Sequence, residues 1–392
     1  MRIGMITGEY PPDHGGVGDF TDQLAHALAD LGHRVHVITS SPRTSAPSPE
    51  DRQVAEGPNR LSVHRMIDRW RFGCWRKILR LSRELGLEAL NVQYQTAAYD
   101  MHPVINLLPG QQRRPTLIVT FHDLKVPYLF PKAGPLRWWT VRLLAQRADG
   151  VIVTNREDEQ RLSELKPRIS NLERIPIGSN IPSVPPPGYD RAAERARWGV
   201  TPDDLLLGYF GFLNKSKGGE ALIETLGLLV EQGLPTHLLK IGGRVGTSDP
   251  TNRAYADRVE RLIADLGLEE RVHWTGYVPP EQVSASLYAT DVCVLPYRDG
   301  VSFRRGSLLA CLTHGRAIVT TRPEVLLPEV SNDEAMVLVE PGHPEALAQA
   351  VSRLADDPAL RARLEAGARS LAKHFTWNRI GQRTAAFFAD LI

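Results

Sequence analysis

The chain has 392 residues, of which 42% are hydrophobic and 23% are charged. This composition is typical of a soluble globular protein, and the length suits two domains of average size. The formal net charge at pH 7 is only +2, which gives no reason to expect nucleic-acid binding. No apolar run reaches the roughly 18 residues of a membrane-spanning helix, and no signal-peptide pattern precedes the first apolar segment, so we expect a cytoplasmic protein.

The three cysteines are Cys74, Cys293 and Cys311, and none of them has C-x-x-C spacing. Their small, odd number argues against a disulfide framework, and their spacing argues against a zinc site. We expect Cys293 and Cys311 to be small core residues.

The first predicted strand, residues 2–6, leads through a glycine-rich loop and an amphipathic helix to a second strand at residues 35–39. The loop has Gly-Gly-x-Gly at residues 15–18 instead of the dinucleotide pattern G-x-G-x-x-G. The second strand ends in Ser40 instead of an acid that would bind a ribose. The sequence therefore disfavours an NAD site, and the glycines either approach a bound anion or form a tight turn.

Residues 41–60 are rich in proline, serine and charged residues, which predicts a mobile surface loop. A basic segment follows this loop. Seven lysines and arginines stand between residues 65 and 83 against a single acid. A helix from residue 74 would carry on its outer face Arg76, Lys77 and Arg80. This face is either an ordinary solvated surface or a contact for an anionic lipid surface or a lipid-phosphate acceptor, and residues 135–142 extend it if the two helices are neighbours.

Two further predicted strands, residues 89–92 and 116–120, end in polar loops. His122 lies in the second loop, and a histidine at the carboxyl end of a parallel strand is a candidate for contact with a substrate. The alternative is that this lone histidine makes a structural hydrogen bond. Farther along, Asn155 and Asp158 have the spacing of a helix capping box, which predicts a structural role.

The second half of the chain opens after a proline-rich linker, with a strand at residues 205–211. Lys217 and Gly218 stand just before the next helix, where positive charge suits a diphosphate; a solvated surface lysine is the alternative. Neither an Asp-x-Asp triplet nor the G-x4-G-K-[ST] pattern occurs in the chain. The sequence therefore supports neither a metal-bound donor nor a P-loop nucleotide site.

A further βαβ unit spans residues 291–321, with a short apolar strand, a loop, a helix from Gly306 and a second strand after Gly315. The loop lies at the carboxyl edge of the sheet, where open α/β sheets bind their ligands. Arg304 and Arg305 stand beside the helix start and favour an anion such as a diphosphate. The alternative is that they are solvated residues of a helix start.

On these motifs, the whole chain resembles a glycosyltransferase of the GT-B fold in the retaining family 4. The resemblance implies an α/β protein with two Rossmann-like domains that face each other across a cleft. It also implies a nucleotide-diphosphate sugar as donor, with no metal or other cofactor and no nucleic-acid partner. In such enzymes the equivalent of Lys217 binds the donor diphosphate and the equivalent of His122 meets the donor sugar, so we expect these two residues to be catalytic. The donor-binding residues implied in this way are Gly16, Asn214, Lys217, Gly218, Tyr277, Val278, Asp299, Ser302, Arg304, Arg305, Gly306 and Ser307.

The chain departs from the family pattern at two places. Aligned on Gly315, the two acids of the Glu-x7-Glu motif are replaced by Ser302 and Ala310. An arginine usually follows the glycine at the end of the strand at residues 205–211, and here it is Phe212. These departures prompt the hypothesis of an acidic donor sugar, such as a uronic acid, bound by the arginines.

The predicted domains are residues 1–182 on the acceptor side, a linker at 183–190, a nucleotide-sugar domain at 191–375 and a returning helix at 376–392. The favoured function is retaining, metal-independent transfer of a sugar to a glycan, a lipid-linked acceptor or a small molecule, with possible contact with the inner face of a membrane. Two alternatives remain: a nucleotide-sugar-binding protein that has lost catalysis, and a GT-B epimerase.

Overall fold

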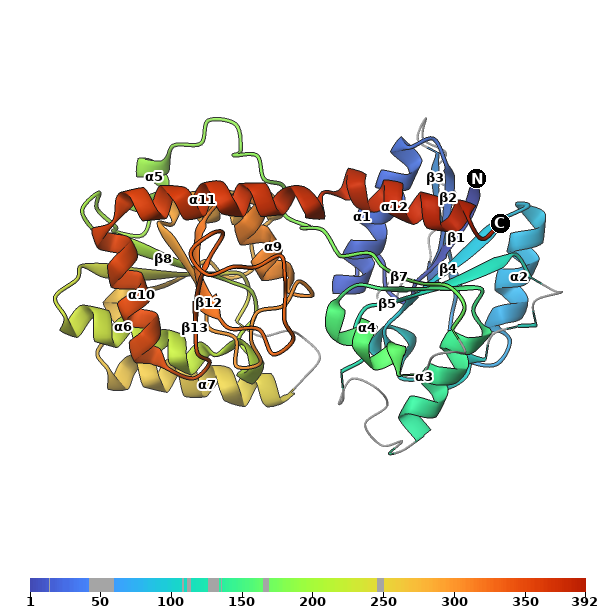
Figure 1. Cartoon of the computed structure of the whole chain (residues 1–392), viewed down its shortest axis with the longest axis horizontal. Coiled ribbons are helices and arrows are strands. Elements are labelled where there is room, and N and C mark those ends of the chain that lie inside the picture. Colours follow the sequence, from blue (N-terminus) through green and yellow to red (C-terminus); the bar gives the residue numbers. More distant parts are fainter. Residues whose placement is uncertain are drawn as a thin grey trace. The chain divides into compact units, whose positions relative to one another are not determined.

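The computed structural model describes residues 1–13, 15–41, 60–107, 109–110, 114–125, 134, 136–164, 169–244 and 250–392. The chain forms two compact units, drawn in Figure 1. One consists of Met1–Gly178 together with Thr376–Ile392, and the other is Ser179–Phe375. Most of the surface loop predicted for residues 41–60 lies outside the described residues.

The first unit is built on a parallel sheet of seven strands in the order β3-β2-β1-β4-β5-β6-β7. Its strands are β1 (Arg2–Ile6), β2 (Arg34–Ser40), β3 (Leu61–Ile67), β4 (Ala89–Tyr94), β5 (Thr116–Phe121), β6 (Gly150–Val153) and β7 (Leu172–Arg174). Its helices are α1 (Gly16–Asp30), α2 (Cys74–Glu84), α3 (Leu136–Arg147), α4 (Arg156–Ser163) and α12 (Trp377–Ala389).

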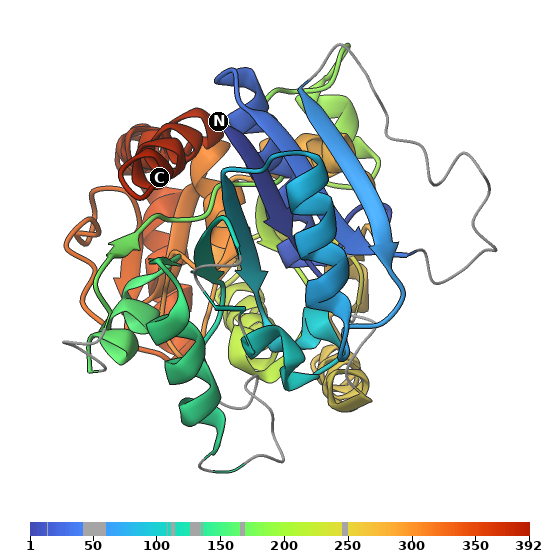
Figure 2. The same cartoon turned by 90° about the vertical axis from the view of Figure 1, so that its right-hand side faces the viewer.

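Successive side chains of each strand enter two different cores, because side chains of a strand alternate between the faces of the sheet. On β5, Leu117 and Val119 join the core that includes residues of α2, α3 and α4, whereas Ile118 joins the core beneath α1 and α12. Figure 2 shows α2 lying over the face of this sheet that is turned toward the viewer. Helix α12 packs on α1, where the ring centroids of Phe20 and Trp377 are 5.3 Å apart.

The second unit is built on a parallel sheet of six strands in the order β10-β9-β8-β11-β12-β13. Its strands are β8 (Leu205–Phe210), β9 (Thr236–Ile241), β10 (Val272–Trp274), β11 (Val292–Leu295), β12 (Ala317–Thr321) and β13 (Val337–Val339). Its helices are α5 (Arg191–Ala196), α6 (Gly219–Glu231), α7 (Pro250–Asp265), α8 (Pro280–Ala289), α9 (Gly306–Thr313), α10 (Pro344–Asp356) and α11 (Pro358–Ala372). The predicted α/β fold with two Rossmann-like sheets is confirmed.

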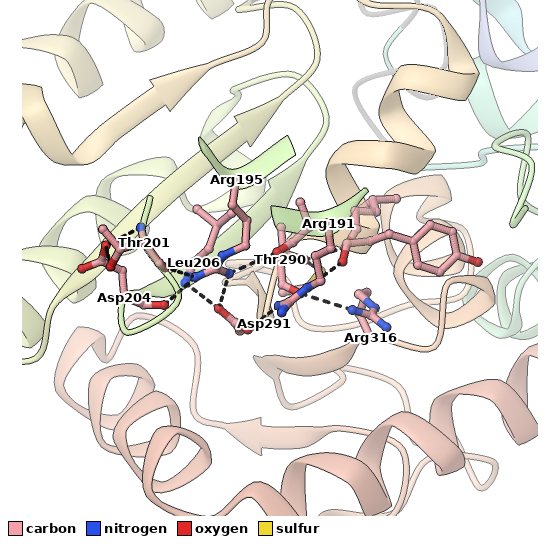
Figure 3. Close-up of polar contacts among 12 residues, drawn as sticks. Arg191, Arg195, Thr201, Asp204, Leu206, Thr290, Asp291 and Arg316 are labelled. Carbon is pink, nitrogen blue, oxygen red and sulfur yellow. Dashed lines mark hydrogen bonds and ion pairs between the residues drawn. The ribbon is translucent and has the colours of Figure 1, made fainter. Parts of the chain in front are cut away.

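An ion-pair network fastens α5 to the amino ends of β8 and β11, as Figure 3 shows. Asp291, just before β11, accepts hydrogen bonds from Arg195 Nη1 at 2.8 Å, Arg191 Nη2 at 2.6 Å and the Leu206 backbone N–H at 2.8 Å. Arg195 also donates to the carbonyl oxygens of Thr201 and Asp204. Because this network lies at the edge of the sheet opposite the strand ends that carry the predicted site, we assign it a structural role.

Two smaller structural predictions are confirmed. Cys293 and Cys311 are buried and free. The Asn155 side chain caps α4 by accepting a hydrogen bond from the Asp158 N–H at 2.8 Å.

Candidate functional site

Lys217 lies at the carboxyl edge of the second sheet, close to the end of β8. It is the last residue of a short 3-10 helix (Lys215–Lys217) that directly precedes α6. The Asn214 side chain fixes this turn, because its Oδ1 accepts hydrogen bonds from the Lys217 N–H at 3.0 Å and from the Ser216 hydroxyl at 2.9 Å. Asn214, which we predicted to contact the nucleotide-sugar donor, therefore positions Lys217.

The Lys217 ammonium lies over the backbone of Gly211, where β8 ends. A Cβ atom placed on Gly211 would be 2.7 Å from Lys217 Nζ and 3.9 Å from the Cβ of Ser307. Gly211 also has a φ of +120°, which favours glycine. Lys217, the end of β8 and the first turn of α9 therefore meet at one point.

Gly218 is required by the local backbone. Its φ is +71°, and a Cβ atom there would lie 1.9 Å from the carbonyl oxygen of Pro296, just after β11. Only glycine allows α6 to begin this close to β11. The Lys-Gly pair thus has a steric explanation in addition to a chemical one.

The two predicted arginines converge on one carboxylate. Asp299 Oδ2 accepts a hydrogen bond from Arg304 Nη2 at 2.7 Å, and Asp299 Oδ1 accepts one from Arg305 Nη2. The guanidinium carbon of Arg305 lies 4.8 Å from the centroid of the Tyr297 ring, and the Tyr297 hydroxyl bonds Ser307 Oγ at 2.8 Å. Both arginine side chains are only 12% exposed and are fixed by their ion pairs with Asp299. The alternative that they are solvated residues of a helix start is therefore wrong.

The positive charge of this cluster exceeds its negative charge. The cluster has three basic side chains, Lys217, Arg304 and Arg305, and one carboxylate, Asp299. The buried Nε of Arg305 has no hydrogen-bond partner among the described residues. Burial, and next the charge of Arg305, lower the pKa of Lys217 to about 8. Arg305 is the N-cap residue of α9, so the amino end of this helix, where its dipole is positive, lies at the cluster. The Arg305 side chain makes no capping hydrogen bond to the first N–H groups of α9.

Lys240 adds a cation that the sequence reasoning did not include. It lies on β9, is almost fully buried, and donates hydrogen bonds to the carbonyl oxygens of Gly242, at 2.7 Å, and Gly243. Burial, and next the charge of Lys217, lower its pKa to about 7. The sequence signal that could have identified it is a lysine inside the apolar run Leu238-Leu239-Lys240-Ile241.

The positions that replace the two family acids are both buried. Ser302 is 1% exposed, and its hydroxyl accepts a hydrogen bond from the Arg304 N–H at 3.4 Å. Ala310 is fully buried in α9. Gly306 and Ser307 form the first turn of α9, as predicted from the sequence.

Tyr277 and Val278 follow β10 at the same edge of the sheet. Tyr277 is 69% exposed, which excludes the alternative of a ring wedged between helices and leaves the ring accessible to a nucleotide base.

In the first unit, the start of α1 is already occupied by a carboxylate. Glu9 Oε1 accepts hydrogen bonds from the Val17 N–H at 3.0 Å and from the Gly18 N–H at 3.3 Å. A Cβ atom on Gly15 would meet this carboxylate at 2.2 Å, whereas a Cβ atom on Gly16 would meet nothing within 4 Å. The glycines therefore form the predicted tight turn, and an anion at Gly16 would lie next to Glu9.

His122 lies at the carboxyl end of β5 and is half-buried. Its Nε2 is 2.9 Å from Gln93 Oε1, and its ring lies edge-on to Phe20 with the centroids 4.6 Å apart. Burial lowers the pKa of His122 to about 3, so the imidazole is uncharged at neutral pH. Gln93, which the sequence reasoning did not select, lies at the end of β4 and was visible there as a polar residue at a strand end.

The predicted basic face of α2 is present and exposed. Arg76, Lys77 and Arg80 are all exposed, and Lys77 Nζ contacts Asp68 at 2.8 Å. Phe72, just before α2, is 84% exposed. Of the proposed extension, Leu136 and Trp139 on α3 are exposed, and Pro135 lies outside the described residues. No helix in the described parts of the chain is long and apolar enough to cross a membrane.

Comparisons with known proteins agree with this arrangement. Residues 15–178 match the model of the glycosyl transferase 4-like domain, and residues 204–357 match the model of glycosyl transferases group 1.

The proteins similar to this chain include two relatives of the same name and a solved structure of the same fold. The D-inositol 3-phosphate glycosyltransferase of Corynebacterium glutamicum is 27% identical over 64% of this chain, and the match spans only 59% of that protein. The protein of the same name from Corynebacterium efficiens is 25% identical over 100% of this chain and 95% of its own length. The crystal structure of HepE from Anabaena in complex with UDP has a TM-score of 0.77 at 18% identity and covers 100% of both chains.

Proposed function

Because the chain is a glycosyltransferase of the GT-B fold and the family 4 group, we propose that it moves a sugar from a nucleotide-diphosphate donor, with retention of the anomeric configuration and without a metal ion. The observation that carries this proposal is the surplus of positive charge around Lys217 and Arg305 at the start of α9. A diphosphate would supply the missing negative charge beside Lys217, Arg304 and Arg305.

In the proposed reaction, the oxygen of an acceptor hydroxyl bonds to the anomeric carbon while the bond between that carbon and the diphosphate oxygen breaks. Negative charge grows on the departing diphosphate oxygen, which takes up the proton of the acceptor hydroxyl. Lys217, Arg305 and the first-turn N–H groups of α9 would stabilise this charge, which is the task that a metal ion performs in other transferases. His122 would contact the sugar as a neutral hydrogen-bonding group. Retention by front-face displacement follows from the family resemblance.

The replacement of the two family acids by Ser302 and Ala310 affects which donor sugar the protein can bind. A carboxylate at the Ser302 position would offer sugar hydroxyls a charged acceptor, whereas the serine hydroxyl is uncharged, is 1% exposed and already accepts a hydrogen bond from the Arg304 N–H. The crystal structure of HepE with UDP makes UDP the first nucleotide to test, and the acceptor in the proposal is a glycan, a lipid-linked sugar or a small molecule.

A screen of nucleotide sugars by thermal shift, followed by product analysis, tests the proposal. A bound donor at about 100 times its Kd would stabilise the protein by about 2.7 kcal/mol. Release of nucleoside diphosphate with transfer of the sugar supports the transferase. Tight binding without transfer or hydrolysis would favour the binding-protein alternative, and conversion of the donor sugar without an acceptor would favour the epimerase.

The lowered pKa of Lys217 predicts a pH dependence of nucleotide binding. Because Lys217 is charged below about pH 8 and neutral above it, the affinity of the free protein for UDP is expected to fall as the pH rises through 8. A Lys217→Arg variant keeps its charge and should lose this alkaline decline. Titration calorimetry at several pH values measures the effect. An equal decline in both proteins would contradict the assignment.

The exposed basic face of α2 predicts binding to anionic membranes. Replacing Arg76, Lys77 and Arg80 together by glutamine is expected to weaken co-sedimentation with phosphatidylserine vesicles by roughly 100-fold, at about 1 kcal/mol for each basic residue. The matched control replaces the three exposed arginines of α7: Arg253, Arg258 and Arg261. Equal losses in the two triple variants, or no binding by the unmodified protein, would contradict a specific membrane face.

A further inference from the structure

We propose that Gln93 is a positioning residue that holds His122 in the tautomer with the proton on Nε2, so that Nδ1 is left as a hydrogen-bond acceptor. The expected contact of His122 with a sugar rests on the proposed function, but the tautomer itself does not.

A chain of buried polar side chains leads from β5 through β4 to His122. Asn91 and Gln93 on β4 are fully buried, and Thr120 on β5 is 1% exposed. Asn91 Nδ2 lies 2.9 Å from Thr120 Oγ1 and 3.4 Å from the carbonyl oxygen of Ile118. Gln93 Nε2 then bonds Asn91 Oδ1, and Gln93 Oε1 lies 2.9 Å from His122 Nε2.

The backbone fixes the polarity of this chain. The carbonyl oxygen of Ile118 can only accept, so the amide of Asn91 turns its nitrogen toward it. Asn91 Oδ1 therefore faces Gln93, which must donate through Nε2 and present its oxygen to the histidine. An amide oxygen can only accept, so His122 Nε2 must carry the proton.

The opposite tautomer would place two acceptors against each other in a buried position. Rotating the Gln93 amide by 180° would avoid this clash, but it would then place the Gln93 oxygen against Asn91 Oδ1, which is also an acceptor. Since a buried group that loses its partner is strongly disfavoured, we expect the Nε2–H tautomer to exceed the other by tenfold or more.

The surroundings hold the ring in this state. Phe20 packs edge-on against the imidazole, and the His122 backbone N–H donates to the Tyr94 carbonyl at 3.1 Å. Burial keeps the ring uncharged at neutral pH. Nδ1 has no hydrogen-bond partner within the part of the chain that the structure describes.

This tautomer restricts which ligand group can contact His122. An unprotonated Nδ1 accepts hydrogen bonds, so its partner must be a donor such as a sugar hydroxyl or ammonium group. A carboxylate at this contact is disfavoured. If the donor is a uronic acid, its carboxylate must therefore contact a group other than His122.

Nitrogen NMR of the full chain tests the tautomer without any substrate. In protein labelled with 15N-histidine, the His122 signals are identified by their loss in a His122→Gln variant. Long-range proton–nitrogen spectra should show Nε2 protonated and Nδ1 unprotonated, and a Gln93→Met variant should convert this into a mixture. A Gln95→Met variant, two residues farther along the chain, should leave the signals unchanged.

A protonated Nδ1 in the unmodified protein would overturn the proposal, and so would an unchanged tautomer in folded Gln93→Met. The first of these outcomes remains decisive even if the methionine variant does not fold. Once a donor is known, Gln93→Met should lower kcat/KM by about tenfold, comparable to His122→Gln. Because the spectra need no donor, failure of the tautomer is distinguishable from failure of sugar transfer.

Discussion

Replacing Lys217 by alanine is expected to lower the kcat of sugar transfer by roughly 100- to 1,000-fold. This is the loss seen when one preorganised group that stabilises a developing negative charge is removed. The Lys217 ammonium lies over the end of β8 and beside the first turn of α9, where the departing diphosphate is placed in our proposal. The measurement is turnover of the nucleotide sugar found in the thermal-shift screen.

The chain provides a matched control two residues away. Lys215 belongs to the same short 3-10 helix but is exposed to solvent, so Lys215→Ala changes the net charge equally without touching the cluster. We expect its kcat to stay within about twofold of the unmodified protein, because an exposed charge is well screened. Similar losses in both variants would show that Lys217 acts only through overall charge.

Replacing Arg195 by alanine is expected to destabilise the protein by about 3–5 kcal/mol. Arg195 is 5% exposed and satisfies both the Asp291 carboxylate and two backbone carbonyl oxygens (Figure 3). Its removal would leave Asp291, whose side chain is 14% exposed, with Arg191 and the Leu206 N–H as its remaining partners, and would take one donor from the carbonyl oxygens of Thr201 and Asp204. Urea unfolding, followed by a spectroscopic probe of the second unit, gives the change in the free energy of unfolding.

Arg191 is the control for this network. It contacts the same carboxylate at 2.6 Å, but its side chain is 48% exposed. Arg191→Ala should cost at most about 1 kcal/mol, since exposed ion pairs contribute little. Equal destabilisation by the two variants would mean that burial of Arg195 is not what gives the network its strength.

The fold was predictable because its signals are local. Apolar runs too short for helices, each followed by a polar or glycine-containing loop and an amphipathic helix, predicted both parallel sheets. The site in the second unit was also largely predictable, because Lys217, Arg304 and Arg305 all stand directly before helices that follow strands.

The sequence did not predict which charges pair with each other. The sharing of Asp299 by two arginines and the capping of α1 by Glu9 depend on side-chain directions that no periodicity encodes. Lys240 and Gln93 were missed for a related reason. Both lie within or at the end of strands, and only the sheet places one beside Lys217 and the other beside His122.

Titration calorimetry with nucleoside diphosphates and their parent nucleosides tests the central claim most directly. If the cluster around Lys217 and Arg305 holds a diphosphate, at least one of UDP, GDP, ADP and TDP should bind about 100-fold more tightly than its nucleoside, and Arg305→Ala should remove most of that difference. Equal binding of diphosphate and nucleoside, or a difference that survives in Arg305→Ala, would contradict the account.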